Sequence, residues 1–149
     1  MENPVVLAVG EALSEAGLVV VRFNFGGVGR SEGAYSGGPA EVEDVAHALA
    51  ALRAVHAGAR VDQAIAVAPP LAFLDWDFLP ALELPIVFVA GDRDPYCPSR
   101  RLAASAGSQR RLEVIPGADH FFAGAEEALR HAVARAVRPA DRAPARAGS

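Results

Sequence analysis

Residues 86–98 read IVFVAGDRDPYCP, and residues 112–122 read LEVIPGADHFF. Each stretch opens with a short strand pattern, and the first, Ile86–Ala90, is an apolar run that is typical of a strand buried on both faces of a sheet. Each run then meets a turn that contains glycine, proline and acidic residues. The sequence therefore predicts two strands, Ile86–Ala90 and Leu112–Ile115, with Asp94 and His120 just beyond their carboxyl ends.

The rest of the chain alternates between helix and strand patterns, with Pro4 and Pro39 at positions where a helix starts well. This alternation predicts an α/β fold, a three-layer sandwich with a mainly parallel sheet of about four strands. We expect one domain over residues 1–137 and a disordered tail over 138–149. The expected elements are helices 4–16, 39–56, 99–107 and 124–137, strands Leu18–Phe25, Val61–Ala68, Ile86–Ala90 and Leu112–Ile115, a glycine-rich loop at 26–38 and an excursion loop at 71–84.

Composition narrows the classes of function. The chain has 149 residues, of which 52% are hydrophobic and 21% charged, so a packed core is expected rather than global disorder. A net charge of −4 without a basic stripe argues against a nucleic-acid partner. One cysteine excludes an internal disulfide, and no stretch has the pattern of a signal peptide or a membrane span. We therefore expect a soluble cytoplasmic protein.

The surroundings of Asp94 and His120 resemble those of the α/β-hydrolase superfamily, in particular its small bacterial serine hydrolases, whose triad runs in the order Ser, Asp, His. The resemblance implies that Asp94 is the orienting acid, that His120 is the general base, and that the substrate is a small-molecule ester or acyl compound. Simpler interpretations stay open. Asp94 would bond its own turn before Pro95, and His120 would be a packed ring beside Phe121.

The serine of such a triad belongs on a sharp turn between a strand and a helix. Gly29-Arg30-Ser31-Glu32-Gly33 has the Gly-x-Ser-x-Gly pattern, but Ser31 lies six positions after the expected strand end at Phe25, and the next helix starts only near Pro39. Cys97 could supply a thiolate, although cysteine commonly acts as a small hydrophobe. The resemblance implies that one strand–helix step, on the order of 30 residues, is missing at Gly58-Ala59-Arg60 and that the chain starts at the family's first helix.

The missing step has consequences for fold and function. The expected strands Leu18–Phe25 and Val61–Ala68 either pair across the gap or leave two open edges. The functional hypotheses are an ester or acyl hydrolase lineage, a catalytically inactive remnant or binding module, and an incomplete reading frame of an active hydrolase. Phe73, Trp76 and Phe78 could cap a small uncharged substrate.

No cofactor or metal is expected. The loop glycines Gly27, Gly29 and Gly33 do not match the dinucleotide-binding fingerprint, because their spacing is one residue too long and no helix follows at once. His47, His56 and His131 lack metal-ligand spacing with a nearby carboxylate. Asp92 is expected to shape the turn rather than to take part in chemistry.

Overall fold

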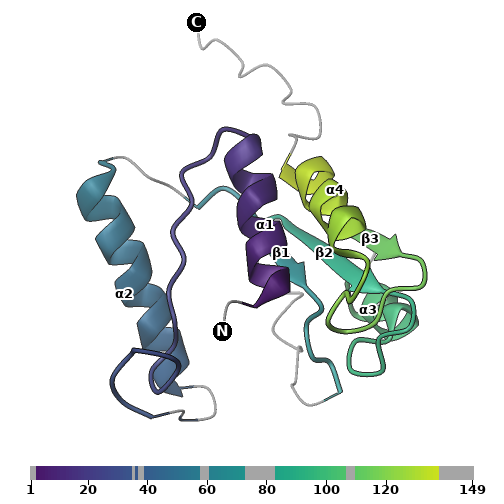
Figure 1. The fold of residues 1–149 in the computed structure, drawn as a ribbon, viewed down its shortest axis with the longest axis horizontal. Coiled ribbons are helices and arrows are strands. Elements are labelled where there is room, and N and C mark those ends of the chain that lie inside the picture. The colour runs from purple at the N-terminus through teal and green to yellow at the C-terminus, as the bar shows by residue number, and fades with distance from the viewer. Residues whose placement is uncertain are drawn as a thin grey trace, which may run out of the picture. The chain divides into compact units, whose positions relative to one another are not determined.

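A computed structural model describes residues 3–34, 36, 39–57, 61–72, 83–106 and 110–137. Its contacts divide the chain into two compact units, one over Val19–Val61 and the other formed by the helix that ends before Leu18 together with the chain from Asp62 onward. Each unit is described by itself. The elements, labelled in Figure 1, are α1 (Pro4–Glu15), α2 (Pro39–Val55), β1 (Ala64–Val67), β2 (Ile86–Gly91), α3 (Ser99–Ala106), β3 (Arg111–Ile115) and α4 (Glu126–Val137).

The sheet of the larger unit is parallel, with strand order β1-β2-β3. The central strand β2 pairs with both neighbours, in a register that sets Val67 opposite Val89 and Gly91 opposite Ile115. All six residues of β2 are buried, as expected for a strand covered on both faces. The prediction of an α/β fold with a parallel sheet is thereby confirmed.

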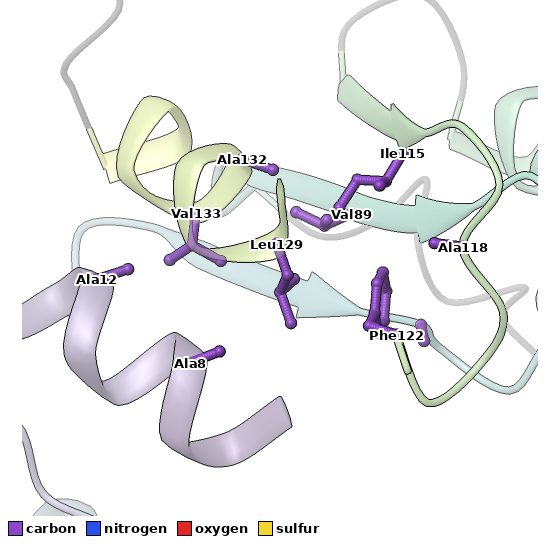
Figure 2. Packing of buried hydrophobic residues seen from close by; sticks show 10 residues of the cluster. Ala8, Ala12, Val89, Ile115, Ala118, Phe122, Leu129, Ala132 and Val133 are labelled. Atoms are coloured by element: carbon purple, nitrogen blue, oxygen red, sulfur yellow. The ribbon is translucent and has the colours of Figure 1, made fainter. Parts of the chain in front are cut away.

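Helices α1 and α4 cover one face of the sheet (Figures 1 and 2). The side chain of Asn3 caps α1 by accepting the N–H of Val5 at 2.9 Å, and Pro4 takes the first helical position. Small residues let the two helices approach closely, and an ion pair of 2.7 Å joins Arg130 of α4 to Glu15 of α1. The buried cluster on this face comprises Ala8, Ala12, Ala68, Val89, Ile115, Ala118, Phe122, Leu129, Ala132 and Val133.

The opposite face of the sheet packs against α3 and the loop that precedes it. Side chains of Phe88 and Ala90 alternate with Val89 along β2, so they point away from the α1 and α4 side. They form a second buried cluster with Leu71, Ile86, Cys97 and Leu102. The unit therefore has the predicted three layers, with β2 in the middle and the ends of β2 and β3 at one edge.

The segment Leu18–Phe25 does not form the strand that the sequence predicts. Leu18–Phe25 was expected to be a buried strand, but its backbone takes no strand pairing, and Val19, Val21 and Phe23 are exposed. A strand is stable only with a neighbour, and no strand among the described residues pairs with this segment. In the part of the chain that the structure describes, the sheet accordingly has three strands rather than about four.

The glycine-rich loop of the unit over Val19–Val61 is held by local hydrogen bonds. Asp44 of α2 accepts the N–H of Gly26 at 2.8 Å, and the N–H of Gly27 donates to the carbonyl of Glu32 at 3.2 Å. The predicted junction Gly58–Arg60, the aromatic cap of Phe73, Trp76 and Phe78, and the predicted tail 138–149 lie outside the described residues. None of the helices in the described ranges is long and apolar enough to cross a membrane.

Candidate functional site

The two residues predicted to act together lie side by side. Asp94 follows β2 and His120 follows β3, and neighbouring parallel strands present their carboxyl ends at the same edge of a sheet. His120 Nδ1 lies 2.8 Å from Asp94 Oδ2. This distance is that of a strong hydrogen bond between an imidazole and a carboxylate.

Asp94 is held rigidly, and its side chain is completely buried. Its Oδ1 accepts the backbone N–H of Tyr96 at 2.8 Å and that of Cys97 at 2.9 Å. These two donors stabilise the carboxylate, which would otherwise be costly to bury. One oxygen of Asp94 therefore makes the turn that the simpler interpretation proposed, and the other oxygen is left for His120.

Two aromatic rings contact the imidazole of His120. Tyr96 and Phe121 meet its imidazole edge-to-face, with ring centroids 5.0 and 5.3 Å away. A carboxylate can only accept a hydrogen bond, so in the neutral imidazole the contact with Asp94 favours the tautomer with the proton on Nδ1 and the lone pair on Nε2. The side chain is 24% exposed. An imidazole oriented in this way can take a proton from a hydroxyl group, as a general base does.

Gly91 lets the two loops approach one another. A Cβ at this position would overlap the carbonyl oxygen of Ala118 and lie 3.0 Å from that of Asp119. The backbone of Arg93 uses this proximity, because its N–H donates to the carbonyl of Ala118 at 3.0 Å. The sequence suggested a turn glycine here, but the contact with a loop more than 20 residues away was not foreseen.

Cys97 is not placed to act as a nucleophile. Its side chain is fully buried in the second cluster. Burial, together with the negative charge of Asp94, raises the pKa of the Cys97 thiol to about 11. The thiol is therefore protonated near neutral pH, and Cys97 packs as a small hydrophobe.

Ser31 lies on a loop and not on a nucleophile elbow. Its hydroxyl donates to the carbonyl of Asn24 at 3.1 Å, and its N–H closes a turn onto Val28. The segment before it forms no strand, and α2 begins only at Pro39. The local geometry thus lacks the strand-to-helix turn that exposes a catalytic serine.

No family model matches the chain, but several known proteins are similar to it in sequence and fold. The structure of an α/β serine hydrolase homologue from Coxiella burnetii is 32% identical, with a TM-score of 0.81, over 92% of this chain and 77% of that one. A Xanthomonas campestris protein described as a member of the α/β serine hydrolases without a lid is 27% identical, with a TM-score of 0.81, over 95% of this chain and 77% of that one.

Two further relatives add fold and sequence information. A putative α/β hydrolase of unknown function from Agrobacterium tumefaciens has the same fold, with a TM-score of 0.81 and 23% identity over 90% of this chain and 75% of that one. An uncharacterised protein of Rickettsia prowazekii is 27% identical over 82% of this chain. The chain spans 66% of the length of that protein.

Proposed function

The chain belongs to the α/β-hydrolase superfamily, and we propose that Asp94 and His120 are the acid and the base of its proton relay. The observation that carries this proposal is the 2.8 Å contact between His120 Nδ1 and the buried carboxylate of Asp94. Structural ion pairs with histidine are common, but this one lies beyond the carboxyl ends of adjacent strands, where open α/β sheets bind ligands.

The chemistry of such a pair is acyl transfer from a small-molecule carboxylic ester or related acyl compound. His120 Nε2 would accept the proton of an attacking hydroxyl, and the carboxylate of Asp94 would stabilise the imidazolium that results. His120 would then return the proton to the leaving oxygen. Asp94 would keep the ring in one orientation throughout, since its other oxygen is fixed by two backbone donors.

Neither of the two nucleophiles that the sequence suggested suits the proposed relay. Ser31 lies on its own loop, and Cys97 is buried and protonated. Loss of the nucleophile alone lowers turnover by roughly a millionfold in a serine protease. We therefore expect serine-type turnover by the chain as written to be negligible.

A second candidate is that the sequence represents an incomplete reading frame of an active hydrolase. The observation in its favour is the run of exposed apolar side chains Leu18, Val19, Val21, Phe23 and Phe25. An apolar run of this kind is expected for a strand that neighbouring elements bury.

A fluorophosphonate probe tests the proposal, because it reacts covalently with activated serines. We expect intact-mass spectrometry to find no labelled chain after incubation with excess probe, while a known serine esterase is labelled under the same conditions. In a version of the chain that carries a Gly-x-Ser-x-Gly strand–turn–helix insert at residues 58–60, we expect labelling that is lost in His120→Ala. Labelling that survives His120→Ala would contradict the assignment of the base.

A further inference from the structure

We infer that Asp92 is a positioning residue that holds the loop of His120 against the loop of Asp94. The inference rests on the proposed function, because it concerns the geometry of the proposed relay. Asp92 follows β2 two residues before Asp94, and the sequence predicted for it only a role in its own turn.

The carboxylate of Asp92 reaches across to the other loop. Its Oδ1 accepts the backbone N–H of Gly117 at 2.6 Å, although 25 residues separate the two in sequence. The N–H of Asp92 also donates to the carbonyl of Ile115, the last residue of β3, at 3.2 Å. Asp92 therefore binds the start of the His120 loop with both its carboxylate and its backbone N–H.

This bond acts at the exposed start of the second loop, one residue before the bond from the N–H of Arg93 to the carbonyl of Ala118. Gly117 has a φ of +77°, and nothing lies within 4 Å of the position of its absent Cβ. The segment after it is braced within itself, since Asp119 Oδ1 accepts the N–H of Phe121 at 2.9 Å. The cross-loop bond of Asp92 thus fixes a preformed turn, and with it His120, relative to β2.

The hydrogen bond between the N–H of Gly117 and the carboxylate of Asp92 is of a strong type. A hydrogen bond from a neutral N–H to a carboxylate is shorter and stronger than one between neutral groups. It complements the close approach at Gly91, which allows the loops to touch but provides no attractive group of its own. Asp92 adds a side-chain bond between the loops, beside the backbone bond from the N–H of Arg93 to the carbonyl of Ala118.

The test compares Asp92→Ala with Asp92→Asn, because asparagine keeps an acceptor oxygen and loses only the charge. The probe is the rate at which the ring Nδ1 proton of His120 exchanges with water, followed by NMR in the full chain. We expect this rate to rise about five- to tenfold in Asp92→Ala, the effect of losing one hydrogen bond, and only about two- to threefold in Asp92→Asn, which loses the charge but keeps an acceptor.

Glu127→Ala is the matched control, since it removes an exposed carboxylate that bonds Arg130 on the same helix and touches neither loop. If the substitutions acted only by lowering the stability of the fold, the exchange rate of the His120 Nδ1 proton would rise in each variant in proportion to the drop in its melting temperature. Should Asp92→Ala not fold, the wild-type chain still provides a measurement. The exposed amide of Gly117 is then expected to exchange at least about tenfold more slowly than an unbonded amide.

The outcomes separate this inference from the proposed function. An unchanged His120 signal in Asp92→Ala, or an Asp92→Asn variant as perturbed as Asp92→Ala, overturns the inference and leaves the relay intact. A wild-type chain without a protected Nδ1 proton on His120 contradicts the proposed relay itself.

Discussion

His120 Nδ1 and Asp94 Oδ2 lie 2.8 Å apart although 26 residues separate them in sequence. The parallel pairing of β2 with β3 produces this contact, because it sets Gly91 opposite Ile115 and so starts both loops at the same level. The glycine at the strand end then allows the loops to touch. The contact is therefore a consequence of strand register and of one missing side chain.

Removal of the Asp94 carboxylate should destabilise the fold. In Asp94→Ala the backbone N–H groups of Tyr96 and Cys97 lose their acceptor inside the protein, and we expect a loss of about 3–5 kcal/mol. Asp94→Asn keeps one acceptor oxygen and should lose less than half as much. Urea unfolding followed by circular dichroism measures both, and equal losses would mean that the backbone donors do not depend on this side chain.

A side chain at position 91 should separate the two loops. We expect Gly91→Ala to cost about 1–3 kcal/mol, because its Cβ would lie 2.7 Å from the carbonyl carbon of Ala118. Gly17→Ala is a suitable control, since that site has a φ of +79° but no atom within 4 Å of the added Cβ. Only Gly91→Ala is expected to weaken the His120 Nδ1 signal. Equal effects of both variants on that signal would argue against the close approach.

The Cys97 thiol should be inert in the folded protein. Its pKa of about 11 keeps it protonated near pH 8, and the side chain is fully buried, so alkylation by iodoacetamide should require unfolding. Because the folded pKa is raised above the ordinary value of 9.0, its contribution to stability is complete below pH 9 and is lost as the pH rises toward 11. Mass spectrometry measures the alkylation, with urea-denatured chain as the control. Rapid native labelling would contradict the buried position.

The cluster between α1, α4 and the sheet should carry much of the stability of the larger unit. Leu129 is fully buried among Ala8, Val89 and Phe122, so Leu129→Ala is expected to lose about 2–5 kcal/mol. Val6→Ala removes an apolar side chain that is half exposed on α1 and should cost less than about 1 kcal/mol. Denaturant midpoints compare the two. Similar losses would show that Leu129 is not part of a packed core.

The parts of the fold that the sequence predicts correctly depend on local patterns. The run around Phe88 is apolar, and the runs around Phe88 and Val114 are both followed by turn residues, so both strands and the loops after them could be placed. Parallel topology then follows from the intervening helix, and with it the proximity of Asp94 and His120. These predictions do not require knowing which residues pair across the sheet.

The errors and omissions concern contacts between distant segments. Leu18–Phe25 has the composition of a strand, but composition does not supply the neighbour that a strand requires. The bond from Asp92 to Gly117 and the approach of Gly91 to Ala118 join residues with no shared local pattern. The sequence leaves two roles open for Asp94, turn residue or partner of His120, and in the structure its two oxygens do both.

The most direct measurement of the central contact is ¹⁵N NMR of the histidine rings in the intact chain, which has four histidines. We expect His120 to carry its proton on Nδ1, in a slowly exchanging, far-downfield signal that disappears in Asp94→Asn, while His47, His56 and His131 exchange rapidly. If His120 exchanges as fast as the other three and is unaffected by Asp94→Asn, the two side chains do not form a relay in this protein.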